Sequence, residues 1–115
     1  MKNTHILSKE VIEKIEKAGF VVEHENKNEY YFGRWTPAGQ NWGFYIDVTE
    51  TFNEFVETVY EYYESFDCSY ETYLWLDNTG HGTNGAPYDM KDVYEDMQEC
   101  ENYILELYEI LKEEL

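Results

Sequence analysis

Positive charge is scarce in this sequence after residue 40. Residues 41–115 contain nineteen Asp and Glu residues but only two cations, Lys91 and Lys112, whereas residues 1–40 contain six acids and six bases. The net charge of −17 therefore comes entirely from residues 41–115. A small domain commonly carries a net charge of magnitude about 2–8. Because proteins bind DNA and RNA largely through cations that neutralise phosphates, the sequence predicts no direct contact with nucleic acid.

Cysteine and histidine are also scarce. The two cysteines, Cys68 and Cys100, have neither the spacing of zinc ligands nor the number of a disulfide framework. None of the three histidines is spaced with a Cys or a carboxylate as metal ligands are. The sequence contains no G-x-S-x-G motif and no Cys/His nucleophile pattern. We therefore expect no catalytic residues, no metal and no cofactor, and a protein that is not an enzyme.

Long apolar runs are absent. No run reaches the roughly 18 apolar residues that a membrane span requires. The first residues, MKNTHILSKEVIEK, lack the apolar core of a signal peptide. We therefore expect a cytoplasmic protein that makes no contact with a membrane. Apolar residues are nevertheless 43% of the chain and aromatic residues 18%, so a core can form. The length of 115 residues predicts a single domain over residues 1–115.

Hydrophobic periodicity predicts an α+β fold. An N-terminal helix, a three-stranded antiparallel meander, an acidic amphipathic helix and a long C-terminal helix follow one another, and the helices pack on one side of the sheet. The predicted ranges are a helix over 8–18, strands over 20–25, 29–35 and 42–48, a helix over 52–66, a fourth strand or else a loop over 70–77, and a helix over about 88–113.

Short local motifs support these helices. Ser8 is a good N-cap with Leu7 and Ile12 at the spacing of a hydrophobic staple, and Gly19 suits a left-handed C-terminal position. Thr51 and Glu54 form a capping box. The last helix has an apolar seam in steps of three and four residues, which we expect to pack on the sheet. Its members are Met90, Val93, Met97, Cys100, Ile104, Leu107 and Leu111.

A glycine-rich segment precedes the last helix. Residues 80–85 read G-x-G-x-x-G, the pattern of a dinucleotide-binding turn. Asp89 and Asp92 stand at the helix start, where a pyrophosphate would need positive potential, so the pattern favours a turn that ends with Pro87 at the first helical position. Two alternatives stay open for this segment. One is a loose cation site, formed by Asp77, Asn78 and Asp89. The other is a contact of the loop with a partner, through Asp77 and His81, or a general base at His81.

Acidic side chains recur on the outer faces of the two later helices. A solvated face normally mixes charges of both signs, but these faces are almost entirely negative. One carboxylate every three to four helical residues gives about one charge per 5 Å, the same order as one phosphate per about 3.4 Å of a DNA strand. The pattern suggests a DNA mimic that blocks a basic cleft. Its candidate partner-binding residues are Glu54, Glu57, Glu61, Glu64, Asp92, Glu95, Asp96, Glu99, Glu106 and Glu109.

A resemblance covers about two thirds of the chain. An acidic amphipathic helix is followed by FDCSYETYLWL (66–76), by a G-x-x-G-x-P loop (82–87) and by VYEDMQECENYI (93–104). This order is similar to small acidic proteins encoded by phages and mobile elements of Gram-positive gut bacteria. In size and acidity the chain also resembles anti-restriction and anti-CRISPR proteins. The resemblance implies an inhibitor, in the cytoplasm of a bacterial host, whose basic partner is a CRISPR effector nuclease or a restriction enzyme.

An interaction module is the alternative function. An antitoxin or a regulatory subunit could use an exposed part of the seam over 90–111. For the DNA mimic, Tyr62 and Tyr88 would instead add contact area beside the acidic residues. The oligomeric state does not follow from the sequence.

Overall fold

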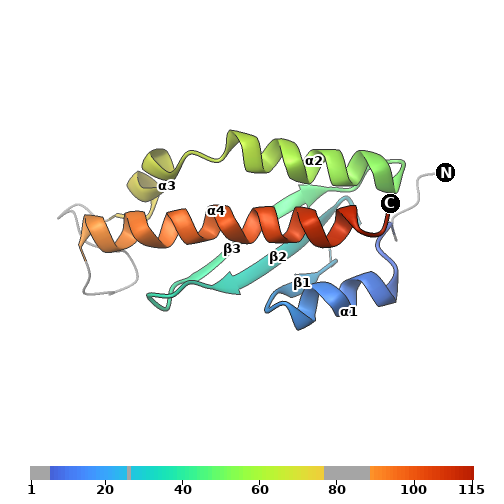
Figure 1. The fold of residues 1–115 in the computed structure, drawn as a ribbon, viewed down its shortest axis with the longest axis horizontal. Coiled ribbons are helices and arrows are strands. Elements are labelled where there is room, and N and C mark those ends of the chain that lie inside the picture. Colours follow the sequence, from blue (N-terminus) through green and yellow to red (C-terminus); the bar gives the residue numbers. More distant parts are fainter. Residues whose placement is uncertain (1–5, 26, 77–88) are drawn as a thin grey trace.

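The computed structural model describes residues 6–25, 27–76 and 89–115. Three helices lie on one face of a three-stranded sheet, and a short helix extends beside the start of the last one (Figure 1). The elements are α1 (Lys9–Lys17), β1 (Val21–Glu23), β2 (Glu29–Trp35), β3 (Asn41–Asp47), α2 (Phe52–Ser65), α3 (Cys68–Leu74) and α4 (Met90–Lys112). The α+β class and the order of the first five elements are as predicted.

The sheet is the antiparallel meander that the short connections predict, in the order β1-β2-β3. Side chains of a strand alternate between its two faces. One face is buried beneath the helices and contributes Tyr30 and Phe32 of β2 and Trp42, Phe44 and Ile46 of β3 to the core. No helix of the described residues covers the opposite face (Figure 1).

Local hydrogen bonds explain where α1 begins and ends. The Ser8 hydroxyl accepts from the Val11 N–H at 3.2 Å, so Ser8 is the predicted N-cap. Gly19 has φ +115°, and its N–H and that of Phe20 donate to the Glu16 and Ile15 carbonyls. These two bonds form a Schellman motif, which requires a residue with positive φ and places Phe20 against the helix. The predicted caps of α1 are thus confirmed.

The predicted fourth strand, with a loop as its alternative, is wrong over residues 70–74, because these residues belong to α3. The Asp67 carboxylate caps α3, accepting from the Ser69 N–H at 2.9 Å and the Tyr70 N–H at 3.2 Å. The β-propensity of the Tyr and Thr residues is overridden because this cap starts a helix, and β1, β2 and β3 of the described sheet do not pair with this segment. Leu76, beyond the helix, takes part in a single β-bridge.

Helix α4 begins at Met90 with Asp89 as its N-cap, and Pro87, which was expected to be its first residue, lies outside the described residues. The Asp89 carboxylate accepts from the Asp92 N–H at 3.2 Å. This N–H belongs to the first turn, where the helix itself offers no carbonyl to accept it. The apolar seam is fully buried from Val93 to Leu111, but Met90 is 55% exposed. Among the described residues, none of the helices combines the length and apolar character needed to cross a membrane.

Candidate partner-binding surface

Helix α2 carries an unmixed row of exposed carboxylates. Phe55, Val56 and Val59 are buried, and this fixes which face of the helix points outward. The predicted binding residues Glu54, Glu57, Glu61 and Glu64 are all exposed. Glu54 accepts a hydrogen bond from the Thr51 hydroxyl at 3.1 Å, within the capping box. None of these four carboxylates forms an ion pair with another described residue.

A groove lies between α2 and the end of α4. It has a volume of about 400 Å³, and we call it the acidic groove. Its lining residues are Asn53, Val56, Glu57, Tyr60, Glu61, Glu64, Tyr108 and Leu115. The rings of Tyr60 and Tyr108 meet at its floor with centroids 4.8 Å apart. The groove therefore combines carboxylates with aromatic surface, and no cation is among the described residues that line it.

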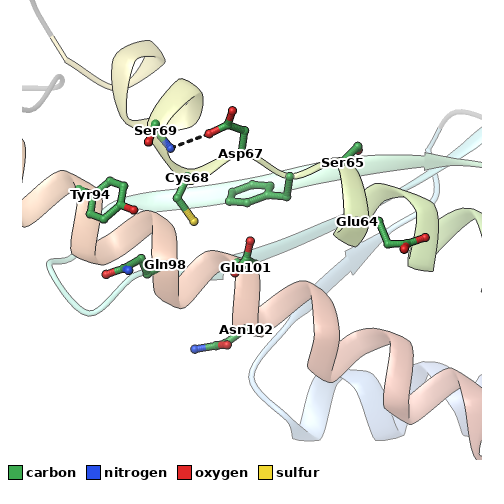
Figure 2. A pocket seen from close by; sticks show the side chains of 10 residues that line it. Glu64, Ser65, Asp67, Cys68, Ser69, Tyr94, Gln98, Glu101 and Asn102 are labelled. Carbon is green, nitrogen blue, oxygen red and sulfur yellow. Dashed lines mark hydrogen bonds between the residues drawn. The ribbon is translucent and has the colours of Figure 1, made fainter.

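A second hollow continues from the acidic groove at Glu64. It lies between the α2–α3 connection and the first half of α4, and its volume is about 710 Å³ (Figure 2). Asp67 and Glu101 add two carboxylates that the sequence did not single out. Glu101 directly follows Cys100 of the apolar seam, so the helical pattern did not place it on the exposed face of α4. Only the crossing of α3 over α4 brings it beside Asp67 and Cys68.

The Cys68 thiol faces Glu101 inside this hollow (Figure 2). Burial first, and then the Glu101 and Asp67 carboxylates, raise the pKa of Cys68 to about 11. The thiol donates weakly to the Met97 carbonyl, with 3.6 Å between sulfur and oxygen. Because the thiolate is the reactive form of cysteine, this environment keeps Cys68 unreactive at neutral pH.

Asp96 corrects the predicted surface. It is 3% exposed and belongs to the buried face of α4, so it is not available to a partner. Its carboxylate accepts from the Ala38 N–H at 3.1 Å and from the Gln40 side-chain amide at 3.4 Å. Asp96 precedes Met97 and therefore lies beside the apolar seam, where the turn between β2 and β3 covers it. It ties that turn to α4.

The other predicted acids of α4 divide into two groups. Asp92, Glu95 and Glu109 are exposed, as predicted. Glu99 is half-buried, and Glu106 forms an ion pair with Arg34 at 3.0 Å. The acids of α4 therefore do not form one continuous row with those of α2. The acidic groove gathers carboxylates of α2, and the neighbouring hollow brings Glu64 of α2 together with Glu101 of α4.

Arg34 occupies a cradle built from two aromatic rings and a carboxylate. Its guanidinium carbon lies 3.9 Å from the ring centre of Tyr103 and 5.2 Å from that of Phe20. Glu106 completes the cradle through the ion pair. Gly19 passes beside it, because a Cβ there would lie 3.3 Å from the Arg34 Nε. This arrangement combines cation–π attraction with a charge-assisted hydrogen bond.

Other predicted contact residues are differently placed. The Tyr62 ring stacks on Phe44 at 4.9 Å and 12°, and burial raises its pKa to about 12, so it supports the core more than it extends the surface. Tyr88, Asp77, Asn78 and His81 lie outside the described residues, together with the G-x-G-x-x-G pattern. The alternative surface on the seam is reduced to Met90, because the rest of the seam is buried.

The described side chains include no group of three or more His, Cys, Asp and Glu residues arranged to hold a metal ion. Comparison of the chain with protein-family models, with curated proteins and with solved structures finds no match.

Proposed function

We propose that this protein is a non-enzymatic inhibitor of a bacterial defence nuclease, most simply a CRISPR effector. It would act in the cytoplasm of the host as an acidic mimic of DNA. The acidic groove of α2 and α4 carries the proposal, because Glu57, Glu61 and Glu64 line it and none of the three forms an ion pair with another described residue. A partner with a basic cleft would replace the solvent that now screens these charges.

The dimensions of the helices support the mimicry. Glu57, Glu61 and Glu64 follow one another along α2 at intervals of about 6 and 4.5 Å, from a rise of about 1.5 Å per residue. The phosphates of one DNA strand follow at about 3.4 Å of axis. The 23 residues of α4 extend over about 35 Å, close to one turn of duplex DNA. A cleft that accepts a short stretch of duplex is therefore long enough to accept this pair of helices.

The experiment measures cleavage of a target duplex by a Cas9-type effector with its guide RNA, as a function of inhibitor concentration. The double variant Glu57→Lys with Glu61→Lys reverses two charges in the acidic groove. We expect it to need at least about tenfold more protein for the same inhibition, since like charges at an interface repel. The inhibition by the unmodified protein should weaken as salt rises.

The matched control reverses two charges elsewhere. Glu13→Lys with Glu16→Lys changes exposed residues of α1, so the net charge shifts by the same amount while the acidic groove stays intact. We expect this control to inhibit like the unmodified protein, and circular dichroism checks that both variants are folded. Equal inhibition by the groove variant and the control would refute the mimicry. A restriction endonuclease in the same assay tests the other class of partner.

A further inference from the structure

The uncovered face of the sheet carries exposed aromatic side chains. Trp35 is 64% exposed, Tyr45 is 60% exposed and Val21 is 52% exposed. We call this surface the open face, and its members are Val21 and Glu23 of β1, Tyr31, Gly33 and Trp35 of β2, and Gly43 and Tyr45 of β3. It lies on the side of the sheet opposite to the helices, and hence away from the acidic groove (Figure 1).

Two glycines hold the Tyr31 ring against the open face. Gly33 and Gly43 pair across β2 and β3, and the Tyr31 ring lies over both of them. A Cβ on Gly43 would lie only 2.1 Å from the Tyr31 hydroxyl oxygen, and one on Gly33 would lie 2.8 Å from its ring. The two positions therefore have no side chain because the ring takes that space. One face of the ring thus rests on the backbone of β2 and β3, and the side chain is half-buried.

A small hollow of about 170 Å³ lies at one end of the open face. The rings of Tyr31 and Tyr45 form one wall, with centroids 5.0 Å apart and planes inclined at 51°. Its remaining lining residues are Glu23, Glu25 and Glu29. Among the described residues that line it, every charged side chain is acidic. The Glu23 carboxylate lies close enough to raise the pKa of Tyr31, after burial and Tyr45, so that phenol is neutral.

The same protein already shows what such an arrangement binds. In the cradle of Arg34, a guanidinium lies against the rings of Tyr103 and Phe20 and pairs with a carboxylate. The hollow of the open face has the same components, namely two aromatic rings and carboxylates, and its lining as described contains no Lys or Arg. A planar guanidinium stacks on aromatic rings and binds carboxylates through two N–H groups, whereas an ammonium does not match this geometry.

We propose that the open face binds an arginine side chain of a basic polypeptide partner, with the guanidinium against Tyr31 and Tyr45 and paired with Glu23 and Glu25. The exposed Trp35 and Val21 extend the contact to neighbouring residues of that polypeptide. This second surface is separate from the acidic groove and does not depend on the proposed inhibition of a nuclease. The negative charge of the glutamates that line the hollow, together with its aromatic rings, favours a planar cationic group over an apolar one.

The test measures binding of two fluorescent peptides by anisotropy at about 0.15 M salt. One peptide alternates arginine and glycine, and the other alternates lysine and glycine at the same length and charge. We expect the arginine peptide to bind roughly threefold or more tightly, and Tyr45→Ala to remove most of this preference. Gly43→Ala should weaken binding as well, because the new methyl group displaces the Tyr31 ring without changing any charge.

A matched pair of variants separates this surface from general attraction between opposite charges. Glu23→Gln lies on the open face and Glu57→Gln in the acidic groove, and each removes one carboxylate. We expect only Glu23→Gln to weaken the arginine peptide clearly. Equal binding of both peptides, equal loss in both Gln variants, or no binding at all would overturn the proposal. So would a dimer in sedimentation that Tyr45→Ala disperses, because the occupant would then be a second copy of this chain.

Discussion

The carboxylate of Asp96, on the buried face of α4, accepts hydrogen bonds from the turn between β2 and β3. Inside this turn the Thr36 hydroxyl accepts from the Gln40 N–H at 2.8 Å, and Gly39 has φ +90°. Thr36, Gln40 and Asp96 are all buried, and together they form a small polar network at the edge of an aromatic core. Buried polar groups cost stability when they lose a partner, so the network gives the turn one defined position.

Asp96→Ala removes the acceptor of the Ala38 N–H and of the Gln40 amide. We expect the free energy of unfolding to fall by about 1–3 kcal/mol, because donors are left without partners in the interior. Unfolding in urea measures the change. Glu95→Ala, the exposed neighbour on the same helix, is the control and should stay within about 0.5 kcal/mol of the unmodified protein. An Asp96→Ala protein as stable as this control would show that the network contributes nothing.

Cys68 is predicted to resist alkylation at neutral pH. Its pKa of about 11 lies about 2.5 units above the usual value near 8.5, so the thiolate at neutral pH is roughly three-hundredfold less populated. Alkylation by iodoacetamide should be slow at pH 8 and should accelerate steadily as the pH approaches 11. Mass spectrometry measures the rate, and the same chain in urea is the control with normal reactivity. Reaction of folded Cys68 at the rate of the unfolded chain at pH 8 would contradict the raised pKa.

The raised pKa of Cys68 also determines how the free energy of unfolding changes at alkaline pH. In the unfolded chain Cys68 loses its proton above about pH 8.5, whereas in the fold it keeps the proton until about pH 11. The unfolded state is therefore favoured as the pH rises between these values. Burial also raises the pKa of the Cys100 thiol and thus acts in the same direction.

Among the helices and strands, the sequence predicted those in which the local propensity of the residues and the packing with the rest of the chain favour the same conformation. Strand β2 has the predicted bounds because its alternating pattern, its turn and its partners favour the same conformation. The row Glu57, Glu61 and Glu64 was predictable because it lies opposite an apolar face. For residues at the edge of such an apolar face, periodicity does not decide whether the side chain is buried or exposed. Asp96 is buried only because the turn of a distant hairpin covers that flank of α4.

Helix α3 shows the opposite case. Its residues favour a strand, but the Asp67 cap makes the helix the better conformation. Thr72 is its single fully buried residue, while Tyr70, Tyr73 and Leu74 are exposed. A helix of this kind has little packing to stabilise it, so its cap contributes a large share.

Asp67→Ala should therefore open α3 locally. The loss of the cap costs about 1 kcal/mol, and the amides of residues 71–75 should exchange with solvent roughly fivefold faster or more. Hydrogen exchange measured by NMR follows each amide, with the amides of α4 as an internal reference. Asp67→Asn is the matched control, because Asn caps helices as well as Asp does. Unchanged exchange in the Ala variant would mean that packing on α4, and not the cap, holds α3.

Over the whole molecule, charge is distributed unevenly between α1 and α2. Helix α1 pairs its acids with lysines at helical spacing, and Lys14 also forms an ion pair with Glu114. Helix α2 has no basic residue, and its acids repel one another. Such repulsion costs stability that a mixed surface would keep, as expected where a surface is maintained for binding.

Glu61→Lys tests this cost directly. The new cation stands four residues after Glu57 and three before Glu64, so two repulsive pairs become attractive. We expect the variant to be more stable than the unmodified protein by about 1 kcal/mol at low salt, and the gain should shrink as salt is added. The control Glu13→Lys has the same change of charge, but it places a cation four residues after Lys9 and four before Lys17 on α1, so two attractive spacings become repulsive and it should lose stability. Thermal unfolding at several salt concentrations measures both variants. A stabilised Glu61→Lys protein that fails in the proposed nuclease assay would connect the repulsion on α2 with binding. A destabilised one would show that Glu61 supports the fold itself.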